Sequence, residues 1–498
     1  MYDTRIEVVD NFKFLGLTFD KKMTWKTHLK NLKQSCLSRS RILKILSKKA
    51  WAADRKMLIR IYKSLIRSKL DYGCPVYNSA SSNSLQILNP VQNLCLRLAT
   101  GAFRSSPVVS LEAETGEPNL DIRRKILSSN YIAKTLSIEN HPNIMRTLNP
   151  LYVRKYENSN MKPTIGIQKK NLENNIPFND TLVKTVPKEP WLLKQPKCDL
   201  SLSSYKKENV PAQLFQNEFK IKLTENFQSH IKIYTDGSKN EQAVGCALTI
   251  PEKNIVKRFG LNKNASIFHA ELFALLQSLL TIKELGACNA LIITDSLSCL
   301  QAIMNMFHEN PLVKRVQEEL SSIESFVEFL WCPSHVGIAG NEVADEEAKQ
   351  ALNIDVNHHE LFLDEIKTII KKKYLEEWNT KWVNISPNEN KLRKIKNSVY
   401  PWKTSNRKSR LDEVCLMRMR VGHSKITHSH LFRREDRPLC DKCQEPMTIE
   451  HILIYCRNMR FRSPSFPSTS ISDILKDNEE SIKEALQFLK RNNYLKNL

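Results

Sequence analysis

The chain has 498 residues, which at about 150 residues per domain corresponds to about three domains. Its hydrophobic content of 41% can fill several cores and excludes a chain that is disordered throughout. The formal net charge of +23, from 76 Lys and Arg against 53 Asp and Glu, favours a polyanionic partner. Nucleic acid is the commonest such partner, and an anionic membrane surface is the alternative.

Membrane insertion and secretion are not expected from this sequence. No apolar run approaches the roughly 18 residues of a transmembrane helix, and the start, MYDTRIEVVDNFKF, has acids where a signal peptide needs an apolar core. The 12 cysteines are scattered rather than packed into a short disulfide framework. We therefore expect no membrane partner, an intracellular protein of the nucleus or cytoplasm with free thiols, and one metal site; the oligomeric state stays open.

Residues 1–137 are mostly helical in pattern, after a short strand-like stretch, FKFLGLTFD. The segment DRKMLIRIYKSLIRSKLDYG has an apolar stripe at helical spacing and a basic side. That side is either a solvated face or a nucleic-acid surface. The apolar positions are Leu58, Ile61, Tyr62, Leu65, Ile66 and Leu70, and the basic ones are Arg55, Lys56, Arg60, Lys63, Arg67 and Lys69.

Three further regions follow. Residues 138–226 are rich in Asn, Lys and Pro and are predicted to be a long linker with short ordered pieces. Residues 227–352 show three hairpin-type strand patterns, then helix, strand, helix, helix, strand and helix, which predicts an α/β (α+β) domain with a five-stranded mixed sheet and flanking helices. Residues 353–498 are helical and basic.

Four carboxylates of the 227–352 region are candidate metal ligands. Asp236 stands beside a Gly-Ser pair that predicts a turn, Glu271 borders the apolar stripe of a helix, Asp295 closes a strand, and Asp345 lies in the first turns of a helix near Asn341. Each has an ordinary alternative: a turn residue, a stripe-edge acid, a helix cap or an acid favoured by the helix dipole. If all four converge, a cation such as Mg²⁺ must neutralise them.

His335 lies in the loop WCPSHVGIAGNEVAD that leads into the Asp345 helix. A histidine titrates near neutrality and can transfer protons, although an exposed loop histidine without function is the alternative. Two divalent ions about 4 Å apart, held by such acids, can assist both the attacking and the leaving oxygen in phosphodiester cleavage.

The segments IYTDGS, FHAELFAL, IITDS and PSHVGIAGNEVADEEAK, in this order and spacing, resemble a type 1 ribonuclease H domain over about 125 residues. The resemblance implies cleavage of the RNA strand of an RNA–DNA hybrid with two Mg²⁺ (or Mn²⁺) ions. It implies that Asp236 bridges both ions, that Glu271 and Asp295 ligate one, and that Asp345 ligates the other. It further implies that His335 assists proton transfer or product release.

The same resemblance gives three residues a role toward the substrate. Gly237 and Ser238 are expected to bring the backbone close to the hybrid. Asn341 is expected to stabilise the loop before the last helix or to touch the substrate.

The region of residues 10–137 resembles the part that follows the polymerase palm in reverse transcriptases of non-LTR retrotransposons of the Jockey or I type. The segments that carry this resemblance include FKFLGLTFDKKMTWKTHL and LRLATGAFRSSPVVSLEAETGEPNLDIRR. The paired-Asp polymerase motif of that family does not precede them, so we expect no polymerase activity from this chain alone. A non-catalytic nucleic-acid-binding remnant of such a protein and a working polymerase are the alternatives to a hybrid ribonuclease.

The segment CDKCQEPMTIEHILIYC has the spacing Cys440-x2-Cys443-x7-His451-x4-Cys456. Three thiolates and one imidazole suit a structural Zn²⁺, and four free side chains around a helix are the alternative. Nearby histidines could replace a ligand, and arginines around the cluster could contact RNA or DNA phosphates or form a solvated face. The histidines are His423, His428 and His430, and the arginines are Arg433, Arg434, Arg437, Arg457, Arg460 and Arg462.

Overall fold

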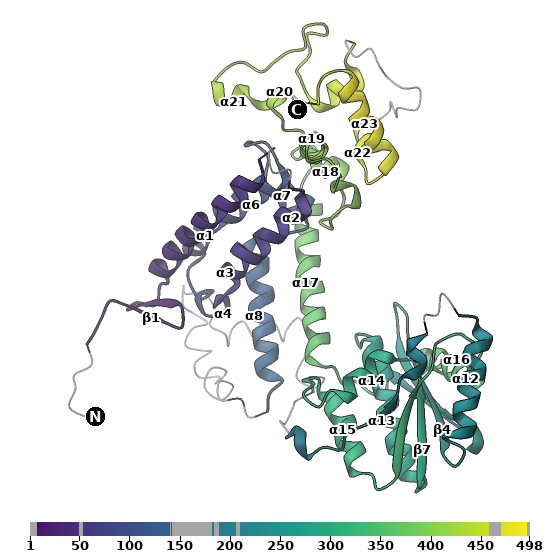
Figure 1. The fold of residues 1–498 in the computed structure, drawn as a ribbon. Helices are drawn as coiled ribbons and strands as arrows, with labels where there is room; N and C mark the ends of the chain where they lie inside the picture. The colour runs from purple at the N-terminus through teal and green to yellow at the C-terminus, as the bar shows by residue number, and fades with distance from the viewer. Residues whose placement is uncertain are drawn as a thin grey trace. The chain divides into compact units, whose positions relative to one another are not determined.

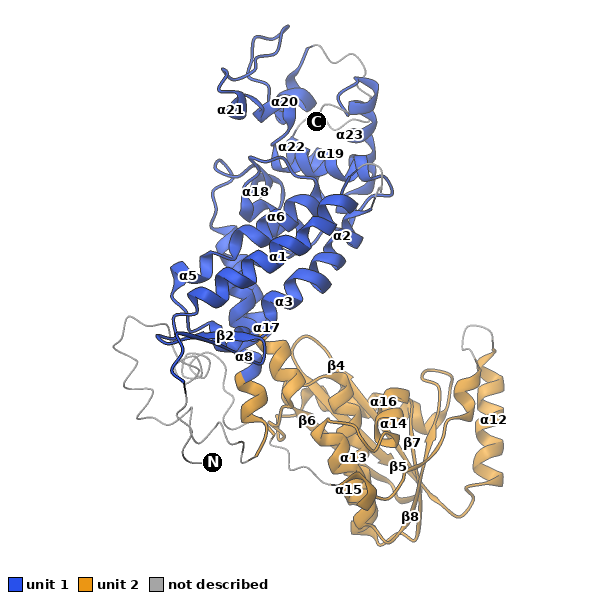
Figure 2. Cartoon of the chain, turned by 60° about the vertical axis from the view of Figure 1, so that its left-hand side comes forward, with its two compact units in different colours: residues 1–131, 150–168, 371–498 blue, residues 132–149, 169–370 orange. Residues whose placement is uncertain are grey.

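The structure is a computed structural model that describes residues 7–48, 53–139, 141, 182–183, 189–205, 210–457 and 470–495. The chain divides into two compact units (Figure 2): unit 1 comprises residues 1–131, 150–168 and 371–498, and unit 2 comprises residues 132–149 and 169–370. Within the described ranges, no helix is both long and apolar enough to span a membrane. Unit 1 therefore combines most of residues 1–137 with most of residues 353–498, two regions that the sequence alone suggests are separate.

The N-terminal part of unit 1 is a hairpin followed by helices (Figure 1). The hairpin pairs β1 (Asn11–Phe14) with β2 (Leu17–Asp20) in antiparallel register, as the stretch FKFLGLTFD predicts. The helices are α1 (Lys26–Leu46), α2 (Arg55–Ile61), the π-helix η1 (Tyr62–Arg67), α3 (Ser68–Asp71), α4 (Cys74–Tyr77), α5 (Ser82–Gln86), α6 (Asn89–Thr100), α7 (Val108–Thr115) and α8 (Leu120–Leu136).

The predicted amphipathic helix is the continuous run from α2 through η1 to α3. Its stripe is buried, with Leu58, Tyr62 and Ile66 at 0% exposure. Its basic side is only in part a free surface: Lys56 and Arg60 are exposed, whereas other cations have partners within unit 1. Arg55 is buried against Glu114, and Lys63 and Arg67 both pair with Glu117.

The C-terminal part of unit 1 is helical, as expected. Its elements are α17 (Leu363–Val383, which begins in unit 2), α18 (Lys391–Ile395), α19 (Arg410–Val421), α20 (Lys425–His428), α21 (His430–Arg433), the π-helix η8 (His451–Tyr455), α22 (Ile471–Leu475) and α23 (Glu479–Arg491).

A buried ionic cluster joins the two sequence segments of unit 1. The Glu114 carboxylate on α7 lies 3.1 Å from Arg55 Nη1 and 3.3 Å from Arg420 Nη1, and all three side chains are buried. Burial alone would raise the pKa of Glu114, but Arg420 and Arg55 lower it to about 2. Losing one partner of such a buried set leaves an unpaired charge, which typically costs about 3–5 kcal/mol.

Unit 2 contains a mixed sheet with helices around it (Figure 1). Its strands are β3 (Lys197–Asp199), β4 (Ile231–Lys239), β5 (Val244–Ile250), β6 (Ile255–Leu261), β7 (Asn289–Thr294) and β8 (Phe326–Trp331). Its helices are α12 (Ala212–Glu225), α13 (Ile267–Leu285), α14 (Leu297–Met304), α15 (Pro311–Ser322) and α16 (Ala339–Gln350). Among the described residues the strand order is β3-β8-β7-β4-β5-β6, with β3, β8, β7 and β4 parallel and β5 and β6 antiparallel.

The sheet differs from the prediction in one strand. Five strands were expected, but β3 adds a sixth by pairing in parallel with β8. The predicted linker also contains α12, whose Phe215 and Phe219 are buried in a cluster with Tyr234 of β4. The last part of the expected linker thus belongs to the folded unit; most of the rest lies outside the described residues.

Two helices pack on opposite faces of β4. A Cβ atom at Gly237 would lie 2.8 Å from the backbone nitrogen of Glu271 on α13, and a Cβ atom at Gly340 on α16 would overlap the ring of Tyr234. Tyr234 and Gly237 point to opposite faces because side chains alternate along a strand. Glycine at these two positions lets α13 and α16 approach β4 closely, and both helices supply candidate site residues.

Candidate active site and metal centres

Asp236 and Asp295 come together because two neighbouring strands are parallel and in register. β4 pairs with β7 so that Thr235 lies opposite Thr294. Asp236 directly follows Thr235, and Asp295 directly follows Thr294. Asp295 does not cap α14, since the N-cap is Ser296. Asp236 is not a turn residue either, because β4 continues to Lys239. The expected Gly-Ser turn is therefore wrong: Gly237 and Ser238 pair with Cys246 and Gly245 of β5.

Glu271 completes a group of three carboxylates. It stands in the first turns of α13, whose close approach at Gly237 brings it to β4. Oxygen atoms of Asp236, Glu271 and Asp295 lie within 4.8 Å of one another, and Asp236 and Glu271 are only 6% and 7% exposed. In the described part of the chain, Glu271 Oε2 is buried without a hydrogen-bond partner.

Proton binding at this group is strongly perturbed. Burial, and then the nearby Asp295, raise the pKa of Asp236 from 3.8 to about 7. Burial and the charges of Asp236 and Asp295 raise the pKa of Glu271 well above its ordinary value. Buried like charges of this kind disfavour ionisation unless a cation offsets them. An oxygen-only donor set, with one oxygen atom lacking a partner, fits a hard divalent ion such as Mg²⁺.

Asp345 lies in a second, adjacent group rather than in the first. It is the seventh residue of α16, beyond the first turn where the helix dipole acts. Its carboxylate is grouped with His335 and Glu342 within 4.8 Å, and its Oδ2 atom lies 3.9 Å from His335 Nδ1 and 2.8 Å from Lys349 Nζ. Its negative charge still raises the pKa values of Asp236 and Asp295.

His335 is held in an exposed loop beside Asp345. Its side chain is 67% exposed and its φ of 51° is uncommon for a residue other than glycine. This position lets the imidazole reach solvent and the neighbouring carboxylates. The chemical role of His335 stays a prediction.

Asn341 is buried next to Asp295 and is 3% exposed. Its Oδ1 atom accepts a hydrogen bond of 3.4 Å from Cys332 Sγ, and its side chain also hydrogen-bonds Asp295. Burial raises the pKa of Asp295, and this hydrogen bond and the nearby His335 oppose the rise. Of the two expected roles of Asn341, its burial favours stabilising the loop before the last helix over touching the substrate.

Two residues of the site escape a motif-based search. Glu342 joins Asp345 and His335, and the spacing of three residues on one helix could have indicated it. Glu365 of α17 accepts hydrogen bonds from the Ser266 backbone N–H (2.6 Å) and contacts His269 Nδ1 (3.1 Å) at the start of α13. It anchors the helix that carries Glu271, and no local pattern signals such a contact across 99 residues.

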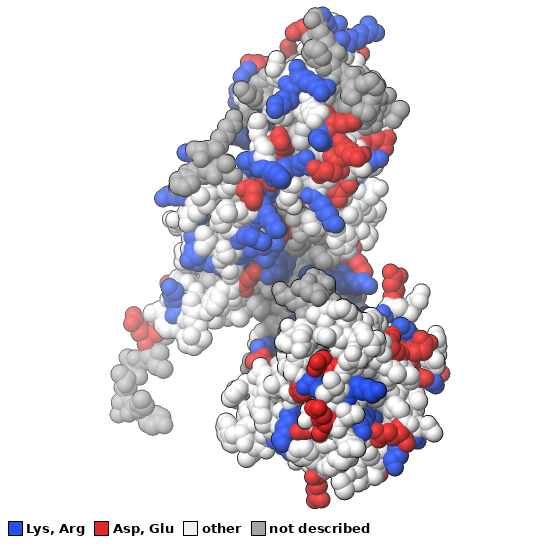
Figure 3. Space-filling view, turned by 45° about the vertical axis from the view of Figure 1, so that its right-hand side comes forward, with Lys and Arg blue, Asp and Glu red and all other residues white. Residues whose placement is uncertain are grey.

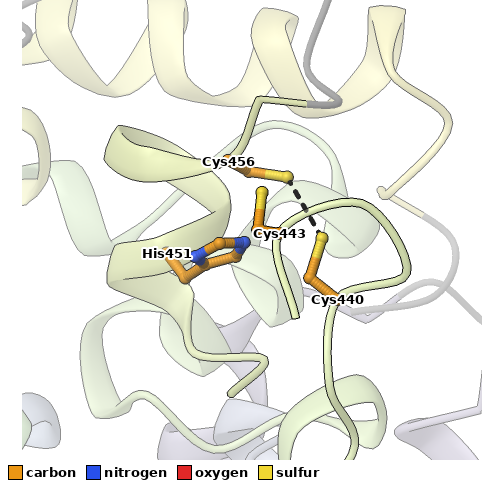
Figure 4. A group of neighbouring side chains, drawn as sticks. All are labelled: Cys440, Cys443, His451 and Cys456. Atoms are coloured by element: carbon orange, nitrogen blue, oxygen red, sulfur yellow. Dashed lines mark hydrogen bonds between the residues drawn. The ribbon is translucent and has the colours of Figure 1, made fainter. Parts of the chain in front are cut away.

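The four residues of the predicted zinc site converge in unit 1. Donor atoms of Cys440, Cys443, His451 and Cys456 lie within 4.8 Å of one another, and Figure 4 shows the three sulfur atoms and the imidazole turned toward a shared space. Cys440 Sγ and Cys456 Sγ are 3.7 Å apart. Burial raises the pKa of Cys440, but a hydrogen bond from the Cys443 backbone and the nearby His451 side chain lower it to about 6.

The buried His451 Nε2 atom has no hydrogen-bond partner in the described ranges, which fits a ligand position. Two of the alternative histidines have other partners: His423 stacks on His428 at 3.7 Å between ring centroids and hydrogen-bonds Ser105. Of the arginines expected around the cluster, Arg433 lies 3.7 Å from Glu435, and Arg460 and Arg462 lie outside the described residues.

Comparisons with known proteins agree with this site. Residues 228–353 match the family described as RNase H. The chain is 27% identical over 138 residues, 26% of its length, to the RNA-directed DNA polymerase from mobile element jockey of Drosophila melanogaster. It is 30% identical over 147 residues, 28% of its length, to the Pol polyprotein of equine infectious anemia virus (isolate 1369).

These alignments cover 14% and 12% of the two relatives, so they concern one part of much longer proteins. The matched residues of our chain contain both acidic groups, and β3, α12 and α17 lie outside the match. Together, the fold, the carboxylates and the relatives identify residues 228–353 as an RNase H family domain of the kind found in retrotransposon polyproteins.

Proposed function

We propose that unit 2 cleaves the RNA strand of RNA–DNA hybrids by hydrolysis with two divalent cations, Mg²⁺ or Mn²⁺. The observation that supports this most directly is the convergence of Asp236, Glu271 and Asp295 with a buried, unpartnered oxygen atom of Glu271. A site built only to bind nucleic acid would have Lys or Arg side chains at this place, because three carboxylates repel phosphate. Cations bound at the acids would supply charge neutralisation and activation of water at the scissile phosphate.

The residues of the chain divide the work between two groups. Asp236, Glu271 and Asp295 would hold one cation, and Asp236 together with Asp345 would hold the second. His335, exposed and 3.9 Å from Asp345, would move a proton to or from the reacting oxygen atoms. Asn341 would keep the Asp295 carboxylate oriented.

Gly237 and Ser238 would expose backbone to the hybrid, in addition to the packing role of Gly237. Ser238 is partly exposed on β4, two residues beyond Asp236. A substrate strand that crosses this end of β4 would bring its phosphates near the acids.

Cleavage of a labelled hybrid by the full chain, with and without Mg²⁺, tests the proposal. Asp295→Asn removes one ligand charge at nearly constant shape, so cleavage should fall by more than about a hundredfold while hybrid binding persists. Asp355→Asn, an exposed acid of the same unit, is the matched control and should cleave normally.

The alternative is a non-catalytic nucleic-acid-binding remnant. Absence of cleavage at every Mg²⁺ and Mn²⁺ concentration, with hybrid binding intact, would favour it over our proposal. Primer extension on an RNA template tests the second alternative, a working polymerase, for which we expect no product.

We further propose that Cys440, Cys443, His451 and Cys456 hold a structural Zn²⁺ in unit 1. The donor set, the convergence of the four side chains and the unpartnered His451 Nε2 atom support it. Metal analysis of the purified chain should find one zinc per chain, and Cys443→Ser should remove it.

A further inference from the structure

Unit 1 contains a basic cavity of about 800 Å³ where α6 meets α19. This volume lies in the range of roughly 300–1,000 Å³ that is usual for ligand pockets. No Asp or Glu lines the cavity within the part of the chain that the structure describes. The lining includes five cationic side chains: Arg97, Arg104, Lys408, Arg410 and Arg418.

The cavity has a fixed wall rather than being a loose gap between helices. Arg410 Nη1 donates to the carbonyl oxygen of Ala99 (2.7 Å), and Arg418 Nε donates to that of Gly101 (2.9 Å), so α19 binds the C-terminal end of α6. Gly101 has a φ of 68°, and a Cβ atom there would overlap Val414. The two helices are therefore held at close approach by contacts that need these residues.

Positive charge at the cavity is incompletely neutralised. The Nε atoms of Arg97 and Arg410 are buried and lack hydrogen-bond partners among the described residues. Arg410 lies 3.1 Å from Glu413, whereas Arg97, Arg104 and Lys408 form no ion pair within the same residues. Burial lowers the pKa of Arg97, because it disfavours the charged form of the side chain. A bound anion would offset this free-energy cost.

An exposed aromatic side chain adjoins the charged wall. The Arg104 guanidinium carbon lies 4.7 Å from the centre of the Phe432 ring, which is 5.9 Å from that of Phe103. Phe432 is 47% exposed, and the cavity wall also includes Leu94 and Leu98. Arginines and stacking aromatics together are the usual means of holding unpaired nucleotides.

We propose that this cavity binds an unpaired nucleic-acid strand, whose phosphates contact Arg97, Arg104 and Lys408 and one of whose bases stacks on Phe432. The guanidinium fork suits phosphate oxygen atoms, and the overall charge of +23 attracts a polyanion. Lys and Arg side chains are prominent on the face of unit 1 in Figure 3. A strand is favoured over a duplex because stacking on Phe432 needs a base with a free face.

The test uses the full chain and a fluorescein-labelled 20-nucleotide oligo-dT, with binding measured by anisotropy at several salt concentrations. Because the probe contains no RNA, the result does not depend on whether unit 2 cleaves hybrids. Arg104→Gln with Lys408→Gln removes two phosphate contacts, so the slope of log affinity against log salt should fall by about 1.4. The matched double variant is Lys26→Gln with Lys30→Gln, both exposed on α1 and about 32 and 25 Å along that helix from Ser47 of the cavity. It should leave the slope unchanged.

Phe432→Ala tests the stacking contact. It should weaken binding of oligo-dT by about tenfold and leave binding of an abasic strand of equal length unchanged. Circular dichroism should show the same helical content in all variants, because the substituted side chains are exposed or lie at the cavity wall.

Three results would overturn the proposal. Equal losses in the two double variants would show that charge spread over unit 1, and not the cavity, binds the strand. A polyglutamate of equal charge that competes as well as oligo-dT would assign the cavity to an acidic protein segment. An equal effect of Phe432→Ala on the abasic strand would exclude base stacking.

Discussion

Replacing Asp236 by Asn should stabilise unit 2 in the absence of divalent cations while abolishing cleavage. The Asp236 carboxyl group is buried beside Asp295, and its pKa rises from 3.8 to about 7. At about 1.36 kcal/mol for each tenfold change in proton affinity, this rise corresponds to about 4 kcal/mol. Because the folded state binds the proton more tightly than the unfolded state, stability is highest at low pH and is lost as the pH rises from 3.8 to about 7.

The stability gain of Asp236→Asn should depend on pH. At pH 8 the wild-type carboxylate is ionised in the folded state, so Asp236→Asn should gain the full amount of about 4 kcal/mol. At pH 5 the folded wild type still holds the proton, and the gain should shrink to about 2 kcal/mol. Thermal unfolding of the metal-free full chain at both pH values measures this gain in stability, with Asp355→Asn as the exposed control.

Saturating Mg²⁺ at pH 8 should stabilise the wild type and should stabilise Asp236→Asn much less. A stability gain of Asp236→Asn that is the same at pH 5 and pH 8, or a loss of stability at pH 8, would refute the reasoning. It would mean that burial does not disfavour the ionised form of Asp236 in the absence of a cation. Equal Mg²⁺ effects on both proteins would refute its role as a ligand.

Four further changes should give distinct outcomes. Gly340→Ala places a methyl group against Tyr234 and should displace α16, lowering the free energy of unfolding by about 1–3 kcal/mol and impairing cleavage. Glu365→Gln weakens charged hydrogen bonds to the start of α13 and should cost about 1.5–3 kcal/mol. Zinc chelation should make residues 438–457 sensitive to protease without stopping hybrid cleavage. His335→Ala should slow cleavage by about a hundredfold at unchanged hybrid affinity.

Each of these outcomes can fail in a recognisable way. Normal stability and activity of Gly340→Ala would mean that α16 does not need its close approach to β4. A Glu365→Gln variant as stable as wild type would leave α13 without its proposed anchor, and unchanged protease sensitivity after chelation would exclude a structural zinc. Wild-type cleavage rates in His335→Ala would remove the histidine from the reaction.

The sequence predicts the strands and acids of unit 2 well because their signals are local. A strand ending in Asp and a helix with a carboxylate beside its apolar stripe are visible in a few residues, as with Asp295 and Glu271. The register that places Asp236 opposite Asp295 follows from parallel pairing of their strands. The predicted turn at Gly237 fails because glycine serves helix packing there, which depends on Glu271 of α13, 34 residues away in sequence.

Contacts over long sequence separations were beyond prediction. Strand β3 has only three residues, and its pairing with β8 depends on residues 131 positions later. Arg55 belongs to a basic helical pattern that suggests a surface, yet it is buried by Glu114 and by the backbone contact of its N–H with Glu413, 358 residues away. No window of sequence contains both partners of such contacts.

The shared core of unit 1 also fixes the order in which the chain can fold as it is made. Arg420 follows Glu114 by 306 residues, so at about 5–20 residues per second the ribosome needs about 15–60 s to supply it. All the strands of unit 2 are complete before then. The RNase H domain therefore has time to fold while the helices that precede it still wait for α19. A chain released early would contain a finished RNase H domain and an unfinished unit 1.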